Sequence, residues 1–299
     1  MSEFDDIFTA SSKEPEEVSV PPFDKEEWIQ QKKAEREHAY EMIDQAAGLM
    51  PGEGERVQTY LDLQSRFPRY SVGNILLLSA QKPEATRIAD FKAWKEGGVY
   101  IKQGETGIIM LEPGNEYTKA DGSVGVAYNA KRVFDISQTT AKIVPEPVVH
   151  RDDRLLIKAL IYNAPCEVRI DDSVHFPDGM AARYDAGSRT IFVARDQEGK
   201  TLFREIAREL AHAHMDQDGY SRENCEFAAV CVSYMICKRN EVDVSTFSFT
   251  QLPDSFSALD SRGVRSELAR IRDVANSISA DMDRLYEKQK DAKARDDAR

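Results

Sequence analysis

The stretch from Leu202 to Met215 constrains this chain more than any other part of its sequence. Apolar residues recur there at the spacing of three and four that is typical of an amphipathic helix. The residues from Arg208 to His212 read Arg-Glu-Leu-Ala-His, one substitution away from His-Glu-x-x-His. In that pattern two imidazoles share a helix face and bind one zinc ion, while the glutamate polarises a metal-bound water. The stretch therefore predicts a helix that carries a modified metallopeptidase motif.

The first ligand position of this pattern holds Arg208, which is not a metal ligand. A guanidinium has no free lone pair at cellular pH and repels a dication. His214 is a poor substitute, because two residues beyond His212 it lies about 200 degrees further round the helix. His175 lies outside the motif, and nothing in the sequence directs it to this helix. The pattern thus resembles a zinc-binding motif but lacks one of its ligands.

Length and composition indicate a protein of two domains that stays in the cytoplasm. A chain of 299 residues with 41% apolar content is long enough for two domains of roughly 150 residues each. No run approaches the ~18 apolar residues of a membrane span, and the acidic N-terminus lacks the apolar core of a secretory signal. The four cysteines include no Cys-x-x-Cys pair, which favours buried thiols in a reducing compartment. We expect no membrane partner.

The charge is unevenly distributed along the chain. The formal net charge is −12, which by itself argues against a nucleic-acid partner. Residues 1–24 hold seven acids and one base, and so carry half of that charge. Between Arg66 and Lys102 there are seven bases and three acids, a local charge of +4. A local basic surface is therefore compatible with an acidic protein.

The pattern of elements predicts an α+β fold in four parts. Residues 1–23 form an acidic tail with too little apolar content to fold. Residues 24–142 form one α+β domain, and a proline-containing linker at 143–149 leads to a second domain over 150–250. Residues 258–295 form a C-terminal amphipathic helix. The expected helices are 24–49, 54–66, 70–78, 89–96, 152–162, 202–215 and 222–238. The expected strands are 99–101, 107–111, a strand pair within 125–135, 166–170 and 189–194.

The C-terminal helix carries an apolar seam of fewer than three heptads, which is too short to settle its partner. The helix either packs on its own chain or forms a dimer. The seam consists of Leu268, Ile271, Ala275, Ile278, Met282 and Leu285.

Several spaced segments resemble one known family. Residues 69–74, 83–87, 91–94, 101–108 and 133–139 are similar to the N-terminal single-stranded-DNA-binding domain of ArdC-like antirestriction proteins. The second half, from Ala182 through the 189–194 strand and residues 209–212 to the helix with Glu226, looks like the zincin-type metallopeptidase domain that follows it in that family. The resemblance covers roughly residues 24–245. It implies a protein of plasmids, conjugative elements or other mobile genetic elements that protects entering DNA from restriction.

For the first domain, the resemblance implies a nucleic-acid-binding surface. Single-stranded DNA needs cations along its backbone and aromatic faces for its bases, worth ~1 to 3 kcal/mol per base. For Tyr70, Phe91 and Trp94 the alternative is a place in the core, and Asn74 is equally well interpreted as a satisfied buried amide. The candidate residues are Arg69, Tyr70, Asn74, Arg87, Lys92, Trp94, Lys95, Lys102, Lys131 and Arg132.

For the second domain, the resemblance implies the roles of a zinc peptidase. Glu209 takes the place of the catalytic base, His212 that of the second histidine ligand, and Glu226 or Glu223 that of the acidic ligand. Because Arg208 departs from the pattern, we expect its guanidinium to pair with Glu226 or Glu223 in place of a metal. We accordingly expect no bound cofactor; an adapted zinc site is the alternative.

The sequence thus favours a single-stranded-DNA-binding, antirestriction-type protein with a degenerate, inactive metallopeptidase domain. One alternative is an active zinc metalloprotease that uses Glu209 as its general base. Another is a protein-interaction module that binds a protein partner through the C-terminal helix.

Overall fold

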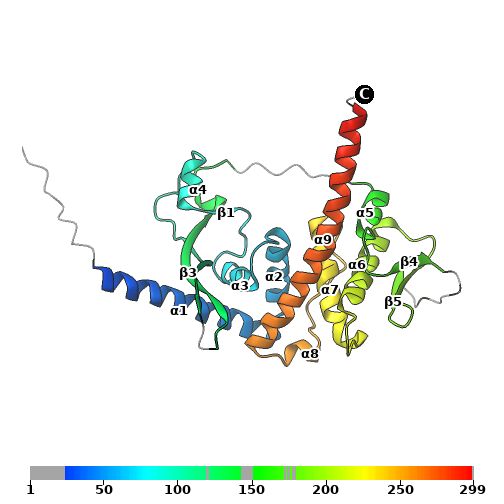
Figure 1. The fold of residues 1–299 in the computed structure, drawn as a ribbon, viewed down its shortest axis with the longest axis horizontal. Coiled ribbons are helices and arrows are strands. Elements are labelled where there is room, and N and C mark those ends of the chain that lie inside the picture. Colours follow the sequence, from blue (N-terminus) through cyan, green and yellow to red (C-terminus); the bar gives the residue numbers. More distant parts are fainter. Residues whose placement is uncertain are drawn as a thin grey trace, which may run out of the picture.

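The computed structural model describes residues 24–118, 121–142, 151–171, 173, 176 and 180–297. The acidic tail predicted for 1–23, the linker at 143–149 and His175 lie outside these residues. The described chain is an α+β protein in which two small sheets flank a set of packed helices (Figure 1). Within those ranges, no helix is long and apolar enough to cross a membrane.

Three helices begin the N-terminal part, and their ends follow local sequence signals. Helix α1 spans Lys25–Leu49, and the side chain of its N-cap Asp24 accepts hydrogen bonds from two backbone N–H groups of the first turn. A short 3-10 helix, η1 (Met50–Gly52), separates it from α2 (Gly54–Arg66). Ser71 caps α3 (Val72–Gln81), which is almost wholly apolar and buried. These boundaries confirm the helices expected in this region.

The N-terminal sheet is antiparallel, with strand order β1-β3-β2. Strand β1 spans Ile88–Asp90, β2 spans Ile108–Thr118 and β3 spans Val124–Asp135. Helix α4 (Phe91–Glu96) begins only after β1, because Asp90 ends the strand and caps the helix. The helix expected from residue 89 therefore starts later than predicted. The strand expected at 99–101 is wrong, since only Ile101 forms an isolated bridge, to Thr139 just after the 3-10 helix η2 (Ile136–Gln138).

The C-terminal part places a second small sheet beside two packed helices. Strands β4 (Glu167–Ile170), β5 (Ala182–Asp185) and β6 (Thr190–Val193) form a sheet of order β4-β6-β5. The β4–β6 pair is parallel and the β5–β6 pair antiparallel. The helices of this part are α5 (Asp153–Leu160), α6 (Gly199–Met215), α7 (Arg222–Arg239) and the short α8 (Asp254–Ser257). Helix α6 is the one predicted from the Leu202–Met215 stretch.

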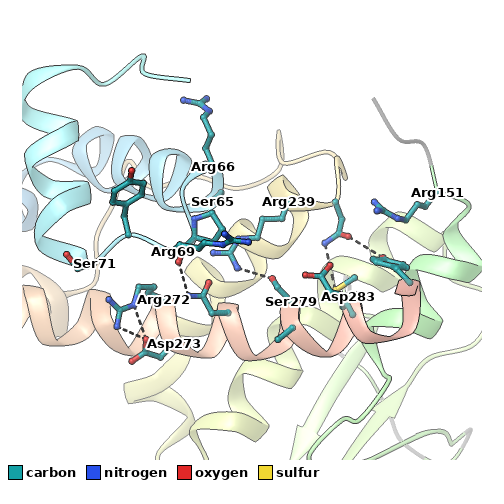
Figure 2. Close-up of a pocket in the computed structure, with 17 residues that line it drawn as sticks. Ser65, Arg66, Arg69, Ser71, Arg151, Arg239, Arg272, Asp273, Ser279 and Asp283 are labelled. Atoms are coloured by element: carbon teal, nitrogen blue, oxygen red, sulfur yellow. Dashed lines mark hydrogen bonds and ion pairs between the residues drawn. The ribbon is translucent and has the colours of Figure 1, made fainter. Parts of the chain in front are cut away.

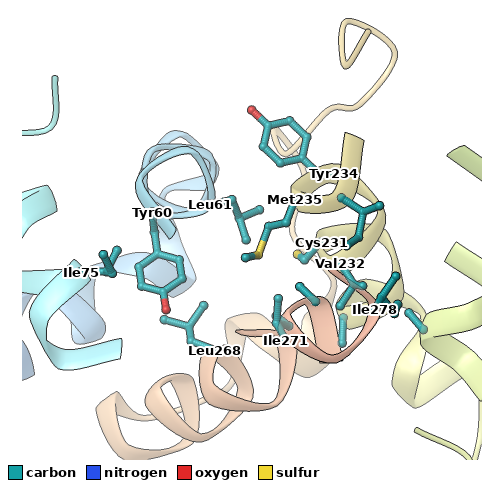
Figure 3. Close-up of a cluster of buried hydrophobic side chains, with 14 of the residues drawn as sticks. Tyr60, Leu61, Ile75, Cys231, Val232, Tyr234, Met235, Leu268, Ile271 and Ile278 are labelled. Atoms are coloured by element: carbon teal, nitrogen blue, oxygen red, sulfur yellow. The ribbon is translucent and has the colours of Figure 1, made fainter. Parts of the chain in front are cut away.

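Helix α9 (Ser261–Asp297) joins the two parts through one continuous core. It contacts α1 and α3 of the N-terminal part and α5, α6 and α7 of the C-terminal part. Figure 3 shows Tyr60 and Leu61 of α2 facing Met235 of α7 across Leu268 and Ile271 of α9. The predicted seam is thus buried against its own chain, with Leu268, Ile271, Ala275, Ile278 and Met282 at most 2% exposed.

Candidate functional site

Helices α6 and α7 bring together the residues that the modified zinc motif singled out. Arg208, Glu209 and His212 lie on α6, while Arg222 and Glu226 lie one turn apart at the start of α7. Glu209 and His212 are completely buried. A buried carboxylate is costly unless it is paired, so its partners decide what this cluster can do.

Both carboxylate oxygens of Glu209 are held by one arginine. Arg222 donates from Nη1 to Oε2 at 2.8 Å and from Nη2 to Oε1 at 2.6 Å. The backbone N–H of Tyr184 on β5 also donates to Oε2, at 2.6 Å. Burial alone would lower the pKa of the Arg222 guanidinium, but the bonds to Glu209 hold that pKa above its usual value. Both carboxylate oxygens of Glu209 are therefore already occupied by hydrogen-bond donors.

The imidazole of His212 also has both ring nitrogens engaged. Its Nε2 lies 3.2 Å from Oε2 of Glu226, and its Nδ1 lies 3.1 Å from the hydroxyl of Tyr220. Burial raises the pKa of that hydroxyl to about 12, so Tyr220 stays neutral at cellular pH. His212 is thus fixed between a carboxylate and a hydroxyl.

Arg208 forms an ion pair with Glu226, and its second contact is Glu205 at 3.6 Å. The sequence left open whether Glu226 or Glu223 would be the partner; the pairing prediction is confirmed for Glu226. Burial tends to raise the pKa of Glu226, but the hydrogen bond to His212 and the charge of Arg208 bring it down to about 2. Glu226 is therefore a permanent anion neutralised by a guanidinium.

This cluster does not fit a metal ion. The position of the first histidine ligand holds a cation that occupies Glu226, and Arg222 occupies the glutamate that would polarise a water. Over the described ranges, no three His, Cys, Asp or Glu side chains are arranged to hold a metal. Two guanidinium groups here take the charge-balancing role that a divalent cation would otherwise have.

Two of the candidate DNA-binding residues hold the fold instead. Trp94 is 5% exposed, and its indole N–H donates to the carbonyl of Phe134 at 2.9 Å. Asn74 bonds both backbone groups of Leu111, each at 2.8 Å, and so ties α3 to β2. Both side chains are therefore buried parts of the fold, as the alternative to DNA binding predicted.

Two basic candidates on β3 are paired with acidic side chains. Lys131 lies 2.7 Å from Asp90 and 3.1 Å from Glu112. The hydrogen bond that Lys131 donates to Asp90 contributes most to raising the pKa of Lys131. Arg132 lies 3.6 Å from Glu35 on α1. Much of the positive charge of this strand is therefore neutralised within the chain.

The remaining candidates are more accessible. Two exposed aromatic residues that were not in the candidate list lie beside them. Lys92 and Lys95 lie exposed on α4. Phe91 at the start of α4 is 57% exposed, and Tyr100 just beyond its end is 62% exposed. Arg87 lies over the buried Trp94 ring, 5.5 Å from its centroid. We call Phe91, Lys92, Lys95 and Tyr100 the α4 face.

Other candidates lie at the margins of this face. Lys102 donates to the carbonyl of Ser137 at 2.8 Å. Tyr70 is half-buried against Phe67, with ring centroids 5.9 Å apart, whereas Arg69 beside it is exposed. The α4 face and Arg69 thus carry accessible positive charge.

Comparisons with known proteins find one matching family and two similar crystal structures. Residues 35–138 match the family described as the N-terminal domain of the anti-restriction factor ArdC. The Mn(II)-bound crystal structure of the antirestriction protein ArdC from plasmid R388 is similar at a TM-score of 0.51 and 16% identity, over 71% of this chain and 85% of that one. Its metal-free structure gives 0.48 and 17%, over 72% and 86%. No curated protein sequence matches.

The chain is thus an α+β protein whose residues 35–138 match the N-terminal domain of ArdC. The fold shared with ArdC of plasmid R388 extends beyond that domain and covers 71% of this chain.

Proposed function

We propose that this chain is a single-stranded-DNA-binding, antirestriction-type protein of a mobile genetic element. The match of residues 35–138 to the N-terminal domain of an anti-restriction factor supports the antirestriction part. The cations and exposed aromatic rings of the α4 face support the DNA-binding part.

The distribution of exposed aromatic side chains carries this proposal. Throughout the part of the chain that the structure describes, every exposed tryptophan, tyrosine or phenylalanine belongs to the N-terminal part. Exposed rings beside exposed cations suit unstacked bases and a phosphate backbone. The exposed rings are Trp28, Tyr40, Phe91, Tyr100, Tyr117 and Tyr128.

Fluorescence anisotropy with matched single-stranded and duplex oligonucleotides tests the proposal. The protein should bind the single strand more tightly, and the affinity should fall as salt rises. Replacing Phe91 and Tyr100 with alanine should weaken binding by roughly tenfold or more, because two stacked bases are lost. Lys158→Gln removes an exposed charge from α5 and should leave affinity unchanged. Equal affinity for single strand and duplex would refute the proposal.

We further propose that the C-terminal part is a zincin-like domain without peptidase activity. ArdC of plasmid R388 has a Mn(II)-bound structure, but here Arg208 occupies Glu226 and Arg222 occupies Glu209. With added Mn²⁺ or Zn²⁺, the protein should cleave a casein substrate no faster than its Glu209→Gln variant. Metal-dependent cleavage that Glu209→Gln abolishes would favour the active protease instead.

A further inference from the structure

A pocket rich in arginine lies between the two parts of the molecule (Figure 2). It has a volume of about 730 Å³ and lies between the C-terminal ends of α2 and α7, the loop before α3, and one side of α9. Volumes of this size are typical of small-molecule and cofactor sites. Five arginines line it, namely Arg66, Arg69, Arg151, Arg239 and Arg272.

The positive charge of this pocket is only partly neutralised. Arg272 pairs with Asp273 at 2.7 Å. None of the other four has a carboxylate within 4 Å in the described ranges; Arg151 instead lies over the ring of Tyr286, 4.2 Å from its centroid. Asp283 is the other acidic residue of the lining. In a chain whose net charge is −12, this is a local surplus of positive charge.

Arg239 is a partly buried cation whose hydrogen-bond acceptors are neutral. Its Nη1 donates to the carbonyl of Ala275 at 3.1 Å and to the hydroxyl of Ser279 at 2.9 Å, while its Nη2 donates to the carbonyl of Gln64 at 3.3 Å. Its buried Nε has no hydrogen-bond partner among the described residues. Burial lowers the pKa of Arg239 to about 10, against a smaller opposite effect of Asp283. A partly buried cation without a counter-charge is costly.

Tyr70 connects this pocket with the surroundings of α4. It lines the arginine pocket and also a second hollow of about 290 Å³, whose lining includes Ala93 of α4. Tyr70 therefore borders both the arginine pocket and the hollow beside α4. In Figure 2, Arg66 extends away from the other labelled arginines.

We infer that this pocket binds phosphate groups of single-stranded nucleic acid, with Tyr70 at its edge beside a base. Guanidinium groups suit phosphate because their planar donors bond two oxygens at once. The inference rests on the proposed function and adds to it a second contact region, formed jointly by the N-terminal part and α9. A free mononucleotide offers the same chemistry and is the other source of phosphate.

The test compares Arg69→Gln and the double variant Arg69→Gln/Arg272→Gln with Arg284→Gln. Arg284 lies on the same helix as Arg272, outside the pocket, and is 62% exposed beside Asp281. With a labelled oligothymidylate, the double variant should bind roughly tenfold more weakly. The slope of log affinity against log salt should fall by about 0.7 for each lost phosphate contact. Arg284→Gln should match the wild type in both respects.

The outcomes separate this inference from the proposed function. If the wild type binds the oligonucleotide and both pocket variants bind it equally well, the pocket inference is wrong while DNA binding stands. If the wild type binds no oligonucleotide, the proposed function fails, and calorimetry with thymidine monophosphate then tests the pocket separately. Binding of the mononucleotide to the wild type but not to Arg69→Gln would support a phosphate site in the pocket. No binding of the mononucleotide to the wild type would overturn the pocket inference. Circular dichroism confirms that each variant is folded.

Discussion

Arginines gather at two places in this molecule, and the two places differ in what neutralises them. Between α6 and α7, Arg208 and Arg222 are paired with Glu226 and Glu209. In the pocket beside α9, Arg69 and Arg239 have only neutral acceptors or none within the described chain. The first place is a closed ion-pair cluster, and the second is an open site for an anion.

The difference shows that residue type alone does not decide what an arginine does. In the cluster each guanidinium was matched to a carboxylate when the chain folded, so the free energy of that attraction contributes to stability. In the pocket, the positive charge of the arginines can still attract an anionic ligand. Replacing arginines should therefore affect folding at the first place and binding at the second.

Arg222→Ala should have the largest effect on stability. It leaves the fully buried Glu209 without its cation, and breaking such a pair costs about 3 to 5 kcal/mol. Denaturant unfolding measures the loss, and Glu209→Gln added to Arg222→Ala should recover part of it. A cost below about 1 kcal/mol would mean that Arg222 does not hold Glu209 in solution.

The pH dependence of stability should reveal the anionic state of Glu226. Its pKa falls on folding from 4.5 to about 2, so its contribution is complete above pH 4.5 and is lost as the pH falls toward 2. Because the side chain is about one-third exposed, solvent screening reduces the contribution to about 2 kcal/mol. The difference in unfolding free energy between wild type and Glu226→Gln should shrink between pH 5 and pH 3. A constant difference would contradict the pairing.

Pyrophosphate should stabilise the folded protein by a smaller amount. At ten times its dissociation constant, a ligand of the pocket adds about 1.4 kcal/mol to the free energy of unfolding. Thermal unfolding should show this gain in wild type and in Arg284→Gln but not in Arg69→Gln/Arg272→Gln. An equal gain in all three proteins would place the anion elsewhere.

Arg69→Gln should have the smallest effect on stability, within about 0.5 kcal/mol, because the side chain is exposed and has no ion-pair partner within the described part of the chain. Denaturant unfolding at low salt checks this value. A loss comparable to that of Arg222→Ala would mean that the pocket is built for folding, and the contrast between the two places would disappear.

Local signals predicted most of the elements. Asp24, Ser71 and the Asp121–Gly122 pair mark real caps and a real turn, because their effects act within a few residues. The α6 helix followed from spacing, and the pairing of Arg208 followed from its departure from the ligand pattern of the family it resembles. Arg222 was missed although a signal existed, since it lies four residues before Glu226 and hence on the same helix face.

Tertiary contacts decided what the sequence could not. Phe91 and Trp94 lie three residues apart on the short helix α4, and only packing determines that Trp94 enters the core while Phe91 faces solvent. Asn74 has a structural role because its side chain bonds the backbone of Leu111 in β2, which lies 37 positions later in the chain. The arginine pocket likewise joins residues from both ends of the sequence, so no local pattern could have indicated it.

The metal content of the protein tests most directly whether arginines have closed the α6–α7 site. The wild type and Arg208→His, purified without tags or added metal and then exposed to zinc and desalted, are compared by elemental analysis. We predict far less than one zinc per chain for the wild type and close to one for the variant, in which two histidines and Glu226 become available. One zinc per chain in the wild type would show that Arg208 does not exclude a metal.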